Sequence, residues 1–422
     1  MKKSVVTIGL TALALLISGC KGNRPTTSST SSTEQEEPKD KYTIMVYMCG
    51  ADLESGYDGY SVNPQGAGLA SEDIYEMCTV YNKPEDVNII IETGGSKAWS
   101  NAKINEKKIQ RWHVENRVLN FDEELPGASM GKASTFQSFL EWGLTNYPAE
   151  KTGVVMWNHG GAMQGVCFDE RYGGDGLLSS EVIEGLEGAF TSTGRTEKLE
   201  WIGYDACLMQ VQDIAEANSD YFNYMVGAEE SEAGTGWQYY SWLDDVYAHE
   251  STETILTAIC DSFVDSYKGM NDQTLSYLDL SKMSDYKTAW ESLAEDVMTT
   301  VSSAESNAFR EMMKTVKCYG SSIDQTTHTV DYGYNHFGTF DVIDFLNKLE
   351  TNYPTLTTKI SAVRTEFSKL VKYNRAGDAA GESNGLCLFF SMNKSCYPDD
   401  YYNANETRFD CWRSVVSDLG LK

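Results

Sequence analysis

Six short runs of consecutive apolar residues constrain the fold of this chain more than any other feature of its sequence. They lack the alternation of apolar and polar residues that marks a strand with one face in water. A continuously apolar strand needs cover on both faces, which is typical of a parallel sheet between layers of helices. The runs span residues 42–48, 87–92, 154–157, 201–204, 224–228 and 386–390.

Apolar residues recur at helical spacing between these runs. The spacing predicts helices near 66–81, 133–146 and 179–191, another directly after Cys207, and more over 250–270, 281–316 and 341–372. We expect Ser134 or Thr135 near the start of the second helix and Ser179 or Ser180 as the N-cap of the third.

Alternating strands and helices predict an α/β fold, with a mostly parallel, doubly wound sheet and helices on both faces. The later helices form an elaboration toward the C-terminus. Because no clean linker follows residue 41, residues 42–422 are expected to form one domain.

The first 20 residues have the pattern of a targeting signal. Lys2 and Lys3 precede an apolar run, and Ser18-Gly19 precede Cys20. This pattern predicts a lipoprotein signal peptide over residues 1–19, with the Cys20 thiol acylated after cleavage. Residues 20–41, rich in Ser, Thr and Glu, then form a flexible tether. We therefore expect a protein that faces away from the cytoplasm, anchored to the cell membrane by lipid.

Charge and cysteine content exclude several classes of protein. The formal net charge is −28, so nucleic acid is a poor partner and cationic peptides or proteins are better ones. The chain has ten cysteines, no Cys-x-x-Cys pair and five histidines, which argues against a structural zinc site. Cys49 and Cys387 lie in or beside apolar runs and are expected to be buried thiols.

Two strand ends carry the residues of a nucleophilic site. The run 154–157 is followed by His159 and Gly160, and the run 201–204 by Asp205 and Cys207. Function in a parallel α/β sheet gathers at the carboxyl ends of strands. If the two strands are neighbours, the imidazole faces the thiol and favours the thiolate, and a helix starting at Cys207 would add to this effect. The glycines after His159 leave N–H groups open for an oxyanion hole.

Each residue also has a structural interpretation. A lone cysteine at a strand end is usually buried and inert, and a lone histidine before glycines is often a turn residue. The joint placement of His159 and Cys207 favours catalysis.

Longer blocks around these residues resemble the clostripain family of cysteine peptidases, relatives of the caspase-, legumain- and gingipain-like enzymes. The resemblance rests on the blocks 158–161 (Asn-His-Gly-Gly), 204–209 (Tyr-Asp-Ala-Cys-Leu-Met), 228–232 and 234–237, and extends outward through 43–53, 139–143, 341–345 and 384–391. It covers residues 42–392 and implies a caspase-like three-layer α/β sandwich.

The resemblance implies roles for single residues. His159 would be the catalytic histidine and Cys207 the nucleophile, with no third member assigned. The N–H groups of Gly160 and Cys207 would form the oxyanion hole. Asp205 would lie near the floor of an acidic pocket for Arg or Lys.

Glu229, Glu230 and Glu232 are further candidates for substrate binding, and a solvated acidic loop is the alternative for each. Here the chain departs from the family, because Glu-Ser-Glu-Ala-Gly replaces Glu-Thr-Glu-Pro-Gly at residues 230–234.

Relatives are often cut between histidine and cysteine, which implies self-cleavage here. Arg171, in a Gly-rich polar stretch, is the first candidate site, and Arg195 and Lys198 are the second. The alternative is an enzyme that is active without cleavage.

No cofactor is required for the predicted chemistry. Calcium is retained as an optional ligand of acidic clusters such as 169–170 and 244–245, which otherwise face water.

Two other functions fit part of the sequence. A non-catalytic, lipid-anchored solute- or glycan-binding protein would share the signal, tether and aromatic content but would lack a reactive thiol. A glycoside hydrolase would use paired carboxylates, which 62 acidic residues supply without specificity. The leading prediction is a lipid-anchored cysteine endopeptidase that cleaves after Arg or Lys.

Overall fold

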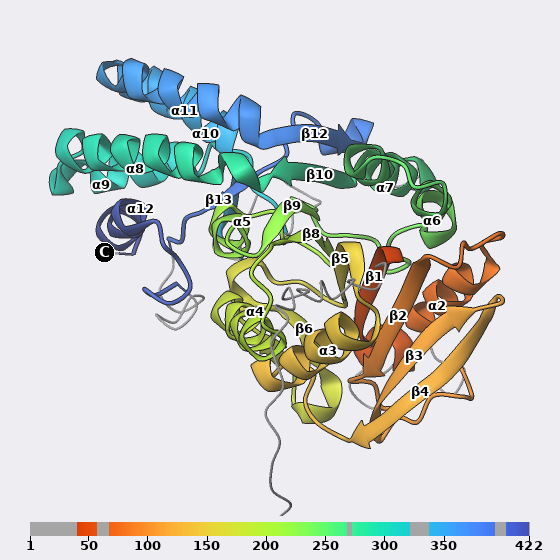
Figure 1. Ribbon diagram of the computed structural model, residues 1–422. Helices are drawn as coiled ribbons and strands as arrows, with labels where there is room; N and C mark the ends of the chain where they lie inside the picture. The colour runs from red at the N-terminus through yellow and green to blue at the C-terminus, as the bar shows by residue number, and fades with distance from the viewer. Residues whose placement is uncertain (1–39, 57–66, 268–271, 321–336, 393–401, 422) are drawn as a thin grey trace, which may run out of the picture. The chain divides into compact units, whose positions relative to one another are not determined.

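A nine-stranded sheet organises the chain (Figure 1), with the strand order β12-β10-β9-β8-β5-β1-β2-β3-β4. The computed structural model describes residues 40–56, 67–267, 272–320, 337–392 and 402–421. The predicted signal peptide, and all of the tether except residues 40–41, lie outside these ranges. Among the described residues, no helix is both long and apolar enough to cross a membrane.

Five parallel strands form the centre of the sheet. They are β1 (Asp40–Cys49), β2 (Val87–Gly94), β5 (Ala149–Trp157), β8 (Leu199–Asp205) and β9 (Phe222–Gly227). Four of them contain one of the apolar runs in full and β9 contains all but the last residue of its run, so the prediction of a parallel sheet is confirmed.

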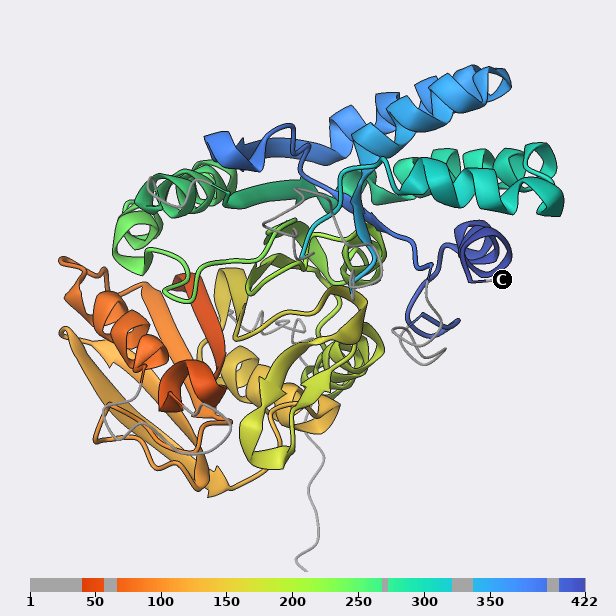
Figure 2. The ribbon, with the colours of Figure 1, turned by 180° about the vertical axis from the view of Figure 1, so that it is seen from behind.

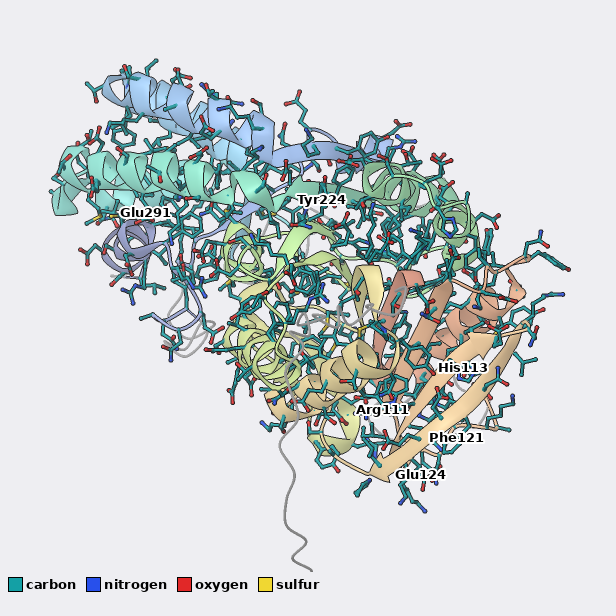
Figure 3. The ribbon with its side chains drawn as sticks, viewed as in Figure 1. Arg111, His113, Phe121, Glu124, Tyr224 and Glu291 are labelled. Carbon is teal, nitrogen blue, oxygen red and sulfur yellow. The ribbon has the colours of Figure 1, made fainter. Side chains whose placement is uncertain are left out.

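Two antiparallel strands extend the sheet at each edge. They are β3 (Lys108–Glu115) and β4 (Val118–Pro126) on one side, and β10 (Thr274–Asp279) and β12 (Val371–Ala376) on the other. Apolar runs do not predict β3, because its centre carries Arg111 (Figure 3), whose buried guanidinium pairs with Glu92 at 2.8 Å.

Helices cover both faces of the sheet (Figures 1 and 2). Alternate residues of β1 enter two separate apolar cores, one packed by α3, α4 and α5 and the other by α2, α6 and α7. The first three helices are α3 (Ala133–Asn146), α4 (Ser179–Thr193) and α5 (Gln212–Asn218), and the second three are α2 (Leu69–Thr79), α6 (Tyr239–Tyr247) and α7 (Thr252–Ser266). The three-layer α/β architecture is therefore confirmed.

The helical elaboration packs beyond β10 and β12 (Figure 1). It contains α8 (Met283–Thr300), α9 (Ser306–Met313), α10 (Val342–Asn352), α11 (Thr357–Leu370) and α12 (Asp410–Val415). The apolar run 386–390 is a strand as predicted, β13 (Cys387–Phe389), but it pairs with β11 (Thr339–Asp341) in a separate small sheet.

Two local predictions are wrong. The helix expected directly after Cys207 begins only at Gln212, because the chain first turns through Leu208, whose φ is +66°. Neither Ser179 nor Ser180 is the N-cap of α4. Leu178 holds that position, and its N–H donates to the Glu181 carboxylate at 3.1 Å.

Candidate active site

The candidate site lies at the carboxyl ends of two neighbouring strands, β5 and β8. Their parallel register pairs Trp157 with Asp205. The backbone N–H of Asn158 donates to the carbonyl of Asp205 at 3.3 Å, just beyond the last pair. His159 and Cys207 each follow two residues after the paired position, so the fold brings both to the same edge.

The two loops approach so closely at Gly160 that no side chain fits there. A Cβ at this position would lie 2.1 Å from the carbonyl oxygen of Cys207. Glycine therefore lets the histidine loop pack directly against the backbone of the cysteine loop, and its uncovered N–H faces the thiol region.

The Cys207 thiol is held by the segment that follows β9. Its Sγ accepts from the Glu232 N–H at 3.2 Å and lies 3.7 Å from the Glu232 carbonyl oxygen. Burial raises the pKa of this thiol to about 11, and the Glu232 charge adds to the rise. The N–H groups of Glu232, Cys207 and Gly160 oppose it. Because α5 begins five residues after Cys207, its N-terminus does not stabilise the thiolate.

His159 has a carboxylate partner that the sequence patterns do not assign. Its Nε2 lies 2.8 Å from Oδ1 of Asp52, in the short helix α1 (Ala51–Ser55) that follows β1. Both side chains are about half exposed. The position of Asp52 after a central parallel strand is the signal that could have identified it, since β1 pairs with β5.

A cavity of about 210 Å³ opens beside both residues. Its walls come from the ends of β5 and β8, from α1 and from the segment after β9. The lining residues are Leu53, Trp157, Asn158, His159, Asp205, Ala206, Cys207, Glu232, Ala233, Gly234 and Gly236.

Three buried carboxyl groups lie in or behind this cavity. Asp205 accepts from the Tyr239 hydroxyl at 2.8 Å and from the Trp237 N–H at 3.2 Å. Asp73, on α2, accepts from the indole N–H of the lining residue Trp157 at 2.6 Å. Glu232 is half-buried as a residue, but both its carboxyl oxygens are shielded from solvent, and its carboxyl group interacts with the side chains of Asp205 and Trp237.

Burial dominates the titration of these acids. It raises the pKa of Asp205 to about 7. It raises the pKa of Asp73 and of Glu232 well above the usual range, and the nearby Asp205 charge adds to both shifts. Among the described residues, no Lys or Arg forms an ion pair with any of the three. The cavity therefore combines buried carboxyl groups with the space for a cationic group, whose charge would favour their ionisation.

Glu229 and Glu230 lie outside the cavity lining. The Glu229 carboxyl accepts from the buried Tyr319 hydroxyl at 3.2 Å, and burial raises its pKa to about 8. The Glu230 carboxylate accepts from the N–H groups of Ser231 and Gly320 at 2.8 and 2.9 Å. The structure thus brings only Glu232 of the three candidate glutamates to the cavity.

The basic residues considered for self-cleavage lie on loops. Arg171 is exposed in the short turn η2 (Glu170–Tyr172), between β6 (Val166–Asp169) and β7 (Asp175–Leu177). Its N–H donates to the Asp169 carboxylate at 2.8 Å. Arg195 and Lys198 follow α4, where Lys198 is exposed and Arg195 half-buried.

Other predicted features have mixed outcomes. The eight cysteines in the described ranges are free thiols, and Cys49 and Cys387 are buried as expected. Cys20 lies outside the described residues. No group of three or more His, Cys, Asp or Glu side chains within the described ranges is arranged to hold a metal ion.

Comparison with known proteins identifies the family of this chain. A sequence profile described as the Clostripain family matches residues 59–417. Clostripain of Hathewaya histolytica is 23% identical over 441 residues, which cover 89% of this chain and 79% of that protein.

Solved structures share the fold. A secreted C11 cysteine protease of Bacteroides thetaiotaomicron superposes with a TM-score of 0.63 at 14% identity, covering 88% of this chain and 99% of that one. A secreted C11 cysteine protease of the same organism, solved in complex with an irreversible peptide inhibitor, superposes with a TM-score of 0.64 at 14% identity, covering 89% of this chain and 100% of that one. An inactive zymogen C11 protease of Parabacteroides distasonis gives 0.62 at 14% identity, covering 92% and 100%.

The family match spans most of the chain and removes the two alternative functions, a binding protein and a glycoside hydrolase. The chain belongs to the clostripain family and is a cysteine-type peptidase.

Proposed function

We propose that this peptidase cleaves after Arg or Lys, with Cys207 as nucleophile and His159 as the acid-base group. The observation that carries the proposal is the cavity that joins the thiol to buried carboxyls without a cation. Asp205 and Glu232 would receive the basic side chain through charge-assisted contacts, which are stronger than contacts between neutral groups.

The reaction follows from the placement of these groups. His159 takes the Cys207 proton while Sγ attacks the carbonyl carbon of the scissile bond. The negative oxygen that forms is stabilised by the N–H groups of Gly160 and Cys207. His159 then gives its proton to the leaving amine, and an acyl-enzyme remains. Water hydrolyses this thioester and restores the thiol.

Burial, with the Glu232 charge adding to it, raises the pKa of the Cys207 thiol to about 11, which supports a protonated resting thiol whose Sγ lies 3.7 Å from the Glu232 carbonyl oxygen. Proton transfer to His159 therefore belongs to the attack step. No cofactor is needed for these steps. The Asp169 and Glu170 carboxylates, considered earlier for calcium, already accept backbone N–H groups of Met130 and Lys97 at 2.9 and 2.6 Å.

Two proposals concern processing and location. Self-cleavage at Arg171, or after Arg195 or Lys198, would sever the chain between histidine and cysteine while β5 and β8 stay paired. Acylation of Cys20 would anchor the peptidase to the cell membrane, on the side that faces away from the cytoplasm. Its partners there would be protein or peptide substrates.

The first prediction concerns the dyad. Cys207→Ala should lower peptide hydrolysis at least about 10³-fold, and His159→Ala about 10²- to 10⁴-fold, because the pair acts as a unit. The double variant should lose no more than the worse single variant. Activity and thermal melting are measured together, and Cys78→Ala, a half-buried thiol on α2, is the matched control. Wild-type turnover by Cys207→Ala would rule out the proposed nucleophile.

The second prediction concerns pH and specificity. An Asp205 carboxyl with a pKa of about 7 is charged above pH 7 and neutral below it. The ratio of kcat/KM for an Arg substrate to that for its uncharged citrulline analogue should therefore rise from pH 6 to pH 8. Taking the ratio cancels the titration of the dyad.

Asp205→Asn should lower this ratio by about 10- to 100-fold, the equivalent of one charged hydrogen bond. The remaining pH dependence should also flatten. Glu230→Gln is the control, because Glu230 does not line the cavity. An unchanged ratio in Asp205→Asn would show that the pocket does not select by charge.

The third prediction concerns self-cleavage. Purified wild type should yield two fragments on incubation, and Cys207→Ala should stay intact. N-terminal sequencing should find a new terminus at Tyr172, or directly after Arg195 or Lys198. A wild type that remains uncut and fully active would eliminate self-activation.

The fourth prediction concerns the anchor. The full chain made in a bacterial host should enter the detergent phase on phase partitioning, because acylation adds apolar chains. Cys20→Ser should move to the aqueous phase with its peptidase activity intact. Equal partitioning of the two proteins would contradict lipid anchoring.

A further inference from the structure

The contact between His159 and Asp52 lies outside the predicted dyad. Nε2 of the imidazole and Oδ1 of the carboxylate are 2.8 Å apart. The two residues are 107 positions apart in sequence and meet because β1 and β5 are neighbouring parallel strands. The contact is therefore a product of the sheet topology.

The segment that carries Asp52 is anchored independently of His159. The fully buried Glu54 carboxylate accepts the N–H and hydroxyl of Ser71 at 2.9 and 2.7 Å, and the N–H of Ser100 at 2.6 Å. The Ser96 hydroxyl donates to the Ala51 carbonyl at 2.9 Å. Ala51 itself has a φ of +43°, an uncommon conformation that these bonds maintain.

A further bond ties the end of β1, just before α1, to the histidine loop. The side-chain amide of Asn158 donates to the Cys49 carbonyl at 2.7 Å, which joins the end of β5 to the end of β1. The residue before His159 and the residues before Asp52 are thereby fixed relative to each other. The backbone on either side of the Asp52 carboxylate is thus held by bonds that do not involve His159, as expected of a positioning group.

We propose that Asp52 is the positioning residue of His159: it holds the ring through Nε2, so that Nδ1 exchanges the proton with Cys207 and the leaving amine. This assignment rests on the proposed roles of His159 and Cys207.

The proton balance of the step is simple. When Sγ attacks, its proton moves to Nδ1 and the ring becomes an imidazolium, whose charge Asp52 offsets. When the leaving amine departs, the same proton passes from Nδ1 to its nitrogen and the ring is neutral again. The hydrogen bond from His159 lowers the pKa of Asp52, so the carboxylate is charged throughout.

Other titratable groups surround this pair. They are Glu54 on α1, Cys49 on β1, Asp169 and Glu170 at the end of β6 and in η2, and Cys207 and Glu232 across the cavity. Glu54, Asp169 and Glu170 are acids already bonded to protein N–H groups. A pH effect specific to Asp52 must therefore be read as a difference between variants.

The test compares Asp52→Asn, Asp52→Ala and Asp52→Glu with a matched pair elsewhere in the chain. Asp86 lies 3.0 Å from Nε2 of His249, and both side chains are 41% exposed. Asp86 precedes β2 and so lies at the opposite, amino end of the strands. Asp86→Asn removes the same kind of contact without touching the site.

Two measurements are made on each variant: kcat and KM for a peptide, and the rate of Cys207 alkylation by iodoacetamide against pH. Asp52→Asn should lower kcat by about 10- to 100-fold, part of the total that acid-base catalysis supplies, with KM little changed. The rate of alkylation near pH 7 should fall as well, because an imidazole that is no longer held in place accepts the Cys207 proton less readily. Asp52→Glu should restore part of both losses.

The outcomes separate the two proposals. A Cys207 that reacts as in wild type in Asp52→Asn, with kcat unchanged, overturns the assignment of Asp52 alone. Equal losses in Asp52→Asn and Asp86→Asn also overturn it, because they would reflect stability. A wild-type Cys207 that iodoacetamide does not modify, with full turnover by Cys207→Ala, overturns the dyad and the assignment with it.

Discussion

The parallel pairing of β5 with β8 is the interaction on which the candidate active site depends. It places the loops after Trp157 and Asp205 side by side, and Gly160 allows them to touch. The adjacent pairing of β1 with β5 adds Asp52 to the same edge. Three neighbouring strands therefore bring these three side chains to the same edge of the sheet. Loops carry the chemistry, while a sheet buried on both faces supplies the rigidity.

Burial of acidic groups without cations is the main energetic conflict in this structure. Asp73, Asp205 and Glu232 carry carboxyl groups that are removed from water, and burial raises the pKa of each. Proteins usually retain such groups where function needs them, because an apolar replacement would stabilise the fold better. A cationic side chain of a substrate would relieve this conflict, which is the physical basis of the proposed preference for Arg or Lys.

The short segment around Glu232 contacts the candidate nucleophile and also lines the cavity. The backbone of Glu232 contacts Sγ of Cys207, and its side chain faces the cavity. This double role concerns the residues where the sequence departs from the family, Glu-Ser-Glu-Ala-Gly at 230–234. Changes in this segment would therefore alter the surroundings of the Cys207 thiol and the wall of the cavity together.

The sequence by itself determined the parallel centre of the sheet, the helices on both faces and the placement of His159 and Cys207 at the same edge of the sheet. Those features follow from apolar runs and from residues directly after them, which are local signals. Tertiary structure alone decided the antiparallel edge strands, the late start of α5, the partnership of Asp52 with His159, and which glutamate reaches the cavity. Glu229, Glu230 and Glu232 are nearly adjacent in sequence, yet only the path of the chain after β9 turns Glu232 toward Cys207. Contacts between residues far apart depend on packing, and no periodicity or spacing encodes them.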